Sequence, residues 1–336
     1  MKVQEVDPLN FAFVMATAII SITLHILNWQ FFSGLFFLLS TVGFTVLVFL
    51  FGAMFILFPK KMFSEMVHAG ILFKYFTFSA AASGLAIRFC MAGNITIAAL
   101  LGITGAVSAV ILTYATFNNL LFLKKTSIKS VSPYWLLMAI ATNYVGINIT
   151  TFWKAGIIEQ PLFLVISFCF WAFAITIYLL FMGLNLFRMF FMSFEGKDIN
   201  PSYWTCIGAA AIAVVDGCNL LSIPNPPMFL DIVRPFIEGM NIFLWGWASA
   251  WFPILLLMEC WKYTHFKIAI SYQPALWAIV FPLGMYTAAT YLISLSIDLP
   301  TIQVLVPFML WVSLIAWGIV SFLAFVKLLK YIIWKT

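Results

Sequence analysis

The stretch QPALWAIVFPLGMYTAATYLISL, residues 273–295, decides the fold. At about 1.5 Å per residue, roughly 20 apolar residues cross the ~30 Å hydrocarbon core, so this stretch predicts a transmembrane helix. Pro282 stands near its middle, where it removes a backbone hydrogen bond and predicts a kink. Phe281 precedes it and shares a helical stripe with the small residues Gly284 and Ala288. One large ring on a small face is compatible with ordinary packing or with a plug in a narrow passage.

The composition places the whole chain in a membrane. Of its 336 residues 64% are hydrophobic and 8% are charged, whereas soluble domains carry about 25% charged residues. The loops between apolar segments are short, so we expect residues 1–336 to form a single transmembrane transport domain with no soluble domain. We predict ten spans, at residues 10–31, 34–58, 70–91, 95–122, 133–153, 161–190, 202–222, 228–259, 274–296 and 303–332.

The basic residues are distributed unevenly between the two sides. With the N-terminus placed inside, 14 of the 17 basic residues fall on the cytoplasmic side. The outer set is Arg88, Lys154 and Arg234. This bias predicts a multi-pass protein of the cell membrane with N- and C-termini in the cytoplasm. It also accounts for the net charge of +6 without a nucleic-acid partner.

A repeat follows from the starts of the odd-numbered spans. Pro133, Pro201 and Pro274 each open a span, 68 and 73 residues apart, and each is followed by an aromatic residue. Pro8 opens the first span in a similar way, while the third span lacks the proline. Proline is tolerated at a helix start because its missing N–H has no partner there. The unit is therefore a two-helix hairpin of about 70 residues, repeated five times.

The residue sizes assign the two helices of each hairpin to different layers. Small residues permit close approach or leave a passage, and they are fewest in the sixth, eighth and tenth spans. We therefore predict an all-α polytopic membrane protein with ten helices in five hairpins around a central pore. Odd helices would form the inner ring and even helices the outer ring. The fourth span, with Gly102 and Gly105, is an exception, and packing against a neighbouring subunit is one explanation.

The inner spans supply candidates for the lining of the pore. We take Phe281 and Pro282 as the gate, and the pore-lining candidates are Ala16, Ala82, Asn143, Ala209, Ala213, Asp216, Gly284 and Ala288. Asp216 lies on the stripe Ala209, Ala213, Asp216 and Leu220. An ionisable group inside a membrane is a functional candidate, but a packing contact bonded to another helix is an equal alternative. Asn143 would either line the passage or join helices by hydrogen bonds.

Other chemistry finds little support in the sequence. Arg88, at the end of the third span, would attract anions at an outer mouth or extend to the interface as a structural residue. The five cysteines form no C-x-x-C pair, and no zinc-protease, nucleophile-elbow or nucleotide-binding motif is present. We therefore expect no enzyme activity, no metal and no cofactor.

Four segments resemble one transporter family. They are FVMATAIIS (13–21), YWTCIGAAAI (203–212), WGWASAWFPILL (245–256) and FPLGMYT (281–287). In this order and spacing they are similar to the tellurite-resistance/dicarboxylate transporter family, which includes bacterial tellurite-resistance anion channels, plant slow-type anion channels and fungal malate and sulfite permeases. The resemblance implies ten helices, a pore lined by odd helices in each protomer, a homotrimer, and occlusion of the pore by a phenylalanine that corresponds to Phe281.

Two functions are compatible with these patterns. The first is an anion-permeable channel or uniporter of the plasma membrane, gated by Phe281, because a weakly charged inner ring suits permeation. The alternative is a proton-coupled carrier of C4-dicarboxylates such as malate, with Asp216 as the titrating group. In either case the partners are small inorganic or organic anions and the lipid bilayer. A membrane enzyme or scaffold is disfavoured because the polar residues are scattered singly.

Overall fold

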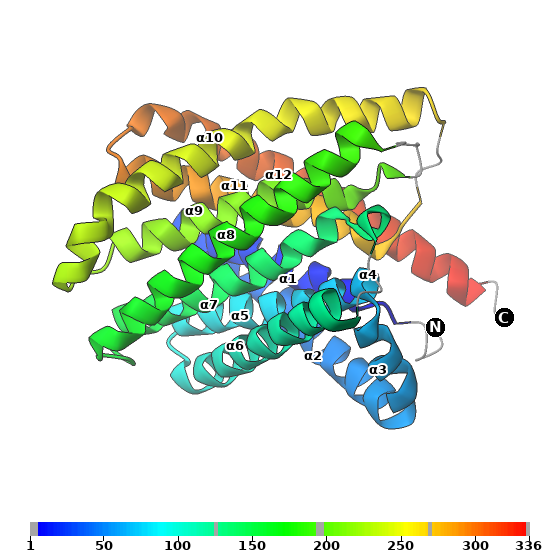
Figure 1. Ribbon diagram of the computed structural model, residues 1–336, viewed down its shortest axis with the longest axis horizontal. Helices are drawn as coiled ribbons and strands as arrows, with labels where there is room; N and C mark the ends of the chain where they lie inside the picture. Colours follow the sequence, from blue (N-terminus) through cyan, green and yellow to red (C-terminus); the bar gives the residue numbers. More distant parts are fainter. Residues whose placement is uncertain (1–5, 124–126, 193–197, 268–270, 334–336) are drawn as a thin grey trace.

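A computed structural model describes residues 6–123, 127–192, 198–267 and 271–333, and within them the chain is almost entirely helical (Figure 1). The α-helices are α1 (Phe11–Ile26), α2 (Gln30–Leu57), α3 (Pro59–Val67), α4 (Ala69–Leu72), α5 (Phe76–Met91), α6 (Ile95–Asn118), α7 (Leu136–Lys154), α8 (Pro161–Phe191), α9 (Thr205–Leu221), α10 (Met228–Thr264), α11 (Trp277–Ser296) and α12 (Leu305–Ile333). Ten helical segments of the described residues are long and apolar enough to cross a membrane, which confirms the predicted number of spans.

The odd and even spans differ sharply in burial. In an 18-residue apolar stretch of each span, 78% to 89% of the residues are buried in the odd spans, against 22% to 39% in the even spans. The buried helices α1, α5, α7, α9 and α11 pack in a closed ring, in which each contacts the next and α11 returns to α1. Each of the other five packs against the inner helix of its own hairpin. This arrangement confirms the five hairpins and the assignment of the inner and outer helices.

The starts of the inner helices explain the proline repeat. A short 3-10 turn precedes each one, at Pro8–Asn10, Phe73–Tyr75, Pro133–Trp135, Pro201–Trp204 and Pro274–Leu276. Four of these turns begin with proline, and the turn before the third span, Phe73–Tyr75, does not. Proline fits this position because its fixed φ suits the first turn and its missing N–H would have no helical partner.

The small residues of the fourth span have an explanation within the chain. Ser79 of α5 donates a hydrogen bond of 2.7 Å to the Gly105 carbonyl of α6. A Cβ at Gly105 would lie 3.1 Å from the Ser79 carbonyl oxygen, and a Cβ at Gly102 would lie 2.8 Å from the Phe152 ring. Glycine therefore allows α6 to approach α5 and α7 closely, and no second subunit is needed to account for these residues.

Some boundaries differ from the prediction. The first span ends at Ile26 and not at residue 31, because the backbone turns at Asn28 with φ of 64° and the next helix begins at Gln30. Asparagine tolerates this left-handed conformation better than most residues. The helix predicted to end at residue 259 continues to Thr264. The short helix α3, between the second and third spans, was not predicted.

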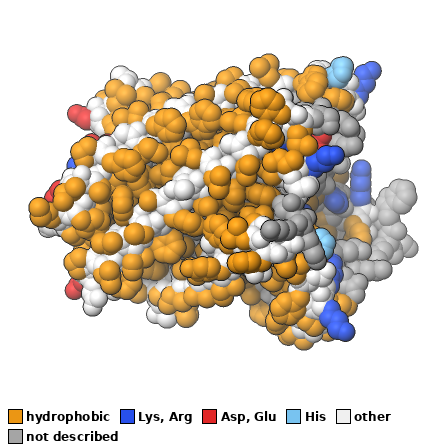
Figure 2. Space-filling model, in the orientation of Figure 1, with side chains coloured by type: hydrophobic (Ala, Val, Ile, Leu, Met, Phe, Trp, Pro, Cys, Tyr) orange, Lys and Arg blue, Asp and Glu red, His pale blue; other side chains and the backbone are white. Residues whose placement is uncertain are grey.

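The two ends of the bundle carry different charges. The chain begins and ends at the same end of the molecule, where α3 also projects (Figure 1). Lys and Arg side chains gather at this end, while apolar side chains cover most of the visible surface (Figure 2). Five lysines of the predicted cytoplasmic set lie outside the described residues, namely Lys2, Lys124, Lys125, Lys197 and Lys335.

Candidate functional site

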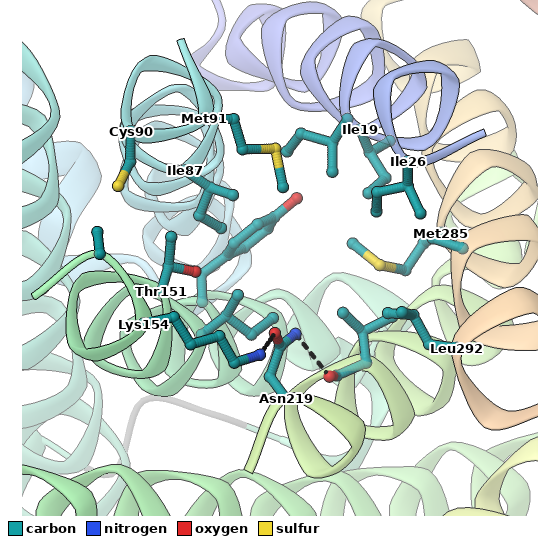
Figure 3. A pocket seen from close by; sticks show the side chains of 16 residues that line it. Ile19, Ile26, Ile87, Cys90, Met91, Thr151, Lys154, Asn219, Met285 and Leu292 are labelled. Carbon is teal, nitrogen blue, oxygen red and sulfur yellow. Dashed lines mark hydrogen bonds between the residues drawn. The ribbon is translucent and has the colours of Figure 1, made fainter. Parts of the chain in front are cut away.

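All five inner helices contribute to one cavity. It has a volume of about 410 Å³, and Figure 3 shows the side chains that line it. These residues belong to the later turns of the inner helices, so the cavity lies at the end of the ring opposite the chain termini. Its walls are mostly aliphatic, which follows from the apolar sequences of the inner spans. The lining residues are Ile19, Ile22, Ile26, Ile87, Cys90, Met91, Tyr144, Ile147, Thr151, Lys154, Ala155, Val215, Asn219, Met285, Ala288 and Leu292.

Two aromatic rings meet at the deep end of this cavity. Tyr144 is its deepest lining residue on α7, and the Tyr144 and Phe281 ring centroids are 6.4 Å apart. Phe281 is fully buried and lies one helical turn deeper than Met285, the deepest lining residue of α11. The Tyr144 hydroxyl has no hydrogen-bond partner among the described residues and lies beside Gly84 of α5. The two rings therefore lie side by side just beyond the lining of the cavity.

Phe281 owes its place to a glycine on the neighbouring helix. A Cβ at Gly208 of α9 would lie 3.2 Å from two carbons of the Phe281 ring and 2.9 Å from Pro282 Cγ. A side chain at position 208 would thus displace both residues. Helix α11 continues through Pro282, so the carbonyl of Ala278 loses its usual helical partner.

A single cation stands at the rim of the cavity. The Lys154 ammonium donates hydrogen bonds to Asn219 Oδ1 at 2.8 Å and to Ser222 Oγ at 2.7 Å. Asn219 is itself held by a 2.9 Å bond from its Nδ2 to the Val215 carbonyl (Figure 3). Lys154 is the single basic residue among the sixteen lining residues, and none of these sixteen is acidic. An ammonium has three donors, so one remains for an anion.

The structure places the predicted pore-lining residues at different sites. Ala288 lines the cavity. Gly284 instead packs on α1, since its Cβ position lies 3.2 Å from Ile19 Cγ2 and its carbonyl accepts a 3.4 Å bond from Thr23. Ala16 and Ala82 are fully buried and are not among the lining residues.

The polar residue predicted on α7 also lies away from the cavity lining. Asn143 is fully buried and donates a 3.0 Å hydrogen bond to the Ala139 carbonyl one turn earlier. Its Oδ1 has no partner among the described residues. This bond lies within the helix, so it neither joins two helices nor faces the cavity.

The stripe that contains Asp216 faces the neighbouring helices rather than the cavity. The Ala213 carbonyl accepts a 2.9 Å hydrogen bond from Trp171 Nε1 of α8. The fully buried Asp216 carboxyl lies against α7, where a Cβ at Gly146 would collide with its Oδ2. Val215 lines the cavity. Successive residues of a helix differ in direction by about 100°, so Asp216 and Ala209 point away from the direction in which Val215 faces the cavity. Neither oxygen of Asp216 has a hydrogen-bond partner among the described residues.

Arg88 does not occupy an exposed mouth. Its side chain is buried, with 6% exposure, between α1, α5 and α2. The guanidinium donates to Ser21 Oγ at 3.0 Å and to Ser33 Oγ at 3.2 Å, and it lies 4.6 Å from the centre of the Phe37 ring. It is not a lining residue of the cavity, so its charge does not stand at the cavity mouth where the prediction placed it. The long Arg88 side chain was also a candidate to extend to the membrane–water interface. Instead, its contacts with two serines and a phenylalanine ring hold it inside the protein.

Most lining residues of the cavity were not among the predicted candidates, including Tyr144 and Lys154 of α7, whereas Thr151 was one of the polar residues for which a place along the passage was an open alternative. Tyr144, Thr151 and Lys154 recur at spacings of seven and three residues, which places them on one face of α7. This stripe was a usable signal. It is less conspicuous than the asparagines and threonines on the other faces of the same helix.

The closed ring of inner helices, the cavity and its single rim cation are typical of a polytopic membrane transporter. A family model described as voltage-dependent anion channel matches residues 5–325. The chain therefore belongs to this family of anion channels and transporters, the same family that its four segments resemble. Its members are transporters and channels rather than enzymes.

Three curated relatives have transporter or membrane-protein descriptions. An uncharacterized transporter of Methanocaldococcus jannaschii is 25% identical over 300 residues, which cover 84% of this chain and 83% of the relative. A second uncharacterized transporter of the same organism is 25% identical over 179 residues, 51% of this chain and 48% of the relative. An uncharacterized membrane protein of Mycobacterium tuberculosis is 30% identical over 132 residues, which cover 39% of this chain and 66% of the relative. The match thus spans 66% of the length of that relative.

Proposed function

We propose that the chain forms an anion-permeable channel or uniporter, with a pore along the axis of the five inner helices of each protomer. One observation carries this proposal: a cavity lined by all five inner helices ends where Tyr144 and Phe281 meet. A passage through a membrane protein needs an axis with no helix on it, and a ring of five helices provides one. The aromatic pair would be the obstruction that opens for conduction.

The charge of the cavity supports an anion as the permeating species. Lys154 is the single cation of an otherwise uncharged lining, so the local field favours anions. A single ammonium also binds weakly enough to let an ion leave, which conduction requires. The aliphatic walls offer no fixed dipoles for a strongly hydrated ion, so ions that lose water easily would enter more readily.

The first experiment is Phe281→Ala in planar bilayers or oocytes. Removing the ring widens the obstruction, and we expect a larger anion current than in the wild type. Ile293→Ala is a matched control, since Ile293 is fully buried on the same helix but does not line the cavity. Unchanged anion current in a folded Phe281→Ala protein would rule out Phe281 as the gate.

The buried carboxyl of Asp216 favours a second candidate, a proton-coupled carrier of C4-dicarboxylates. A buried ionisable group without a hydrogen-bond partner is costly in a membrane and is often functional. This candidate predicts uptake driven by a pH gradient and abolished by Asp216→Asn. Uptake in liposomes that does not depend on the pH gradient would exclude this candidate. A dianion would also be expected to meet two cations, whereas the cavity lining has one.

Further properties belong to the same proposal. We infer one transport domain over residues 1–336, located in the cell membrane with both termini in the cytoplasm, and assembled as a homotrimer. The basic residues at the end of the bundle that carries the termini support this orientation (Figure 2). Protease accessibility of tags at the two termini tests the orientation. The mass of the detergent-solubilised particle tests the trimer.

A further inference from the structure

A second cavity opens on the outside of the bundle, away from the proposed pore. It has a volume of about 400 Å³ and lies between α2 and α6, with α1 and α5 behind it. Phe51 and Phe55 of α2 and Ile111 and Leu112 of α6 form its sides. Its lining is almost entirely apolar, so water gains little by entering it.

This groove opens towards the hydrocarbon of the bilayer. The helix faces beside it are exposed and apolar, with Ile56 77% and Ile111 62% exposed. Both belong to outer helices long enough to span a membrane. The groove is therefore continuous with the surface that contacts lipid, and an acyl chain can reach it from the bilayer.

Helix α3 covers the end of the groove nearest the chain termini. Its residues Met62 and Met66 line the groove and pack against the hydrophobic core. Phe63 and Val67, on the adjoining face, are 60% and 38% exposed. Lys60 lies one turn before Ser64 on the polar side of α3, away from Met62 and Met66 and next to the exposed Phe63 and Val67. A short helix with one apolar and one polar side is typical of helices that lie in the membrane–water interface.

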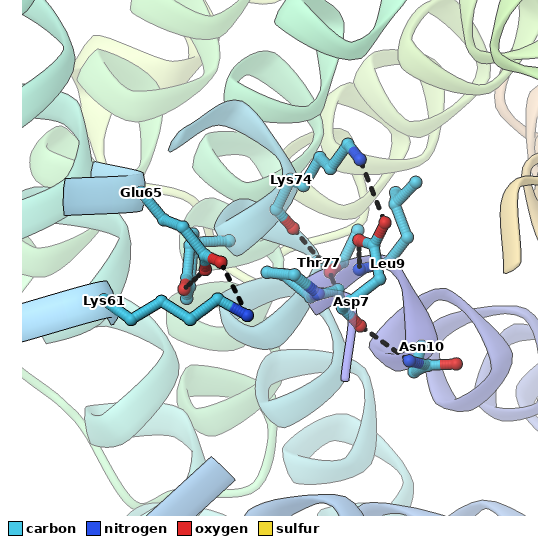
Figure 4. Close-up of polar contacts among 9 residues, drawn as sticks. Asp7, Leu9, Asn10, Lys61, Glu65, Lys74 and Thr77 are labelled. Carbon is cyan, nitrogen blue, oxygen red and sulfur yellow. Dashed lines mark hydrogen bonds and ion pairs between the residues drawn. The ribbon is translucent and has the colours of Figure 1, made fainter. Parts of the chain in front are cut away.

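Two contacts fix the orientation of α3. Glu65 accepts a 3.0 Å hydrogen bond from the hydroxyl of Tyr75, in the 3-10 turn before α5, and Lys61 pairs with Glu65 at 3.4 Å (Figure 4). Lys60 is exposed and makes no ion pair with any residue that the structure describes. These contacts fix α3 relative to the start of α5 and leave the Lys60 ammonium available to a ligand.

We propose that α3 and the groove beneath it bind one anionic phospholipid of the leaflet at the end that carries both termini. One acyl chain lies in the groove under Met62 and Met66, and the Lys60 ammonium contacts the phosphate. Charge complementarity selects this occupant, because basic residues gather at this end. In the orientation proposed above this end faces the cytoplasmic leaflet, which is rich in anionic lipid. The site is independent of the proposed pore.

The test measures lipid retained by the purified protein in native mass spectrometry, with phosphatidylglycerol and phosphatidylcholine as probes. Gly52→Leu fills the groove, and the position tolerates it because no atom lies within 4 Å of a Cβ there. Gly34→Leu is the matched control on the same helix, equally open but outside the groove. Lys60→Gln removes the headgroup contact, and Lys129→Gln removes another exposed lysine at the same end.

The expected result is preferential retention of phosphatidylglycerol by the wild type. Lys60→Gln weakens it about fivefold, the effect of one basic residue near an anionic surface. Gly52→Leu weakens it about tenfold, the effect of roughly two displaced methylenes. Both controls retain the wild-type affinity. Equal retention of the two lipids, or full retention by Gly52→Leu, would overturn the proposal. Loss of oligomers in Gly52→Leu would also overturn it, because a second copy of the chain would then cover the groove.

Discussion

Neutralising the rim cation of the cavity is the most informative perturbation of the proposed pore. Lys154→Gln keeps a side chain of similar length and a donor for Asn219, but it removes the positive charge. If anions approach through this cavity, the variant should conduct less at low anion concentration. Lys154→Arg should preserve most of the current because it preserves the charge.

The expected magnitude follows from the geometry of the rim. Two unit charges about 4 Å apart interact by about 1 kcal/mol in water and by about 4 kcal/mol at an effective dielectric constant of 20. Lys154 is exposed, so the lower value applies. About 1 kcal/mol corresponds to roughly a fivefold loss of anion occupancy at the rim. Since salt screens exposed charges, the loss should shrink at high ionic strength.

The assay is the anion current of purified protein in planar bilayers, in the Phe281→Ala background if the wild-type current is small. Arg234→Gln is the matched control, because Arg234 is a basic residue of the same end that pairs with Asp231 and Glu238 and does not line the cavity. If Lys154→Gln and Arg234→Gln reduced the anion current equally at low ionic strength, the cavity lined by Lys154 would not be the anion entrance.

Three further predictions concern helix packing and are read from thermal unfolding in detergent. Gly105→Ala should destabilise the protein by about 1–3 kcal/mol, because the new Cβ would collide with α5. Gly34→Ala, which has open space around it, should leave the stability unchanged. Equal melting temperatures of the two variants would contradict the close approach of α6 to α5. Trp171→Phe should cost about 1 kcal/mol through loss of the bond to the Ala213 carbonyl, and an unchanged melting temperature would argue against that bond. Arg88→Gln should lower the melting temperature without changing the dependence of current on anion concentration, and a changed dependence would restore Arg88 as a mouth residue.

Much of the architecture follows from simple features of the sequence. The span length, the bias of basic residues and the prolines at helix starts each have a direct physical cause in the bilayer or in helix geometry. Pro133, Pro201 and Pro274 open 3-10 turns before inner helices, as the repeat indicated. The bulky outer spans contact lipid, which explains why residue size separated the two layers.

The rotation of the inner helices was harder to predict. These helices are surrounded by protein, so they carry apolar and small residues on every side. A stripe of small residues then marks either the pore or a close helix contact. Gly284 packs on α1 and Asp216 faces α7, while Ala288 reaches the cavity. Only the neighbouring helices distinguish these cases, and they are far away in the sequence.

The most direct test of the account is the accessibility of Ala288 during conduction. Ala288→Cys would be made in a Phe281→Ala, Cys90→Ser background, since Cys90 also lines the cavity. The account predicts that a negatively charged thiol reagent, added at the end opposite the termini, abolishes most of the anion current. Ile95→Cys, exposed at the same end but outside the cavity, should leave the current unchanged after the same treatment. Full current after complete modification of Ala288→Cys would show that anions do not pass along the axis of the five inner helices.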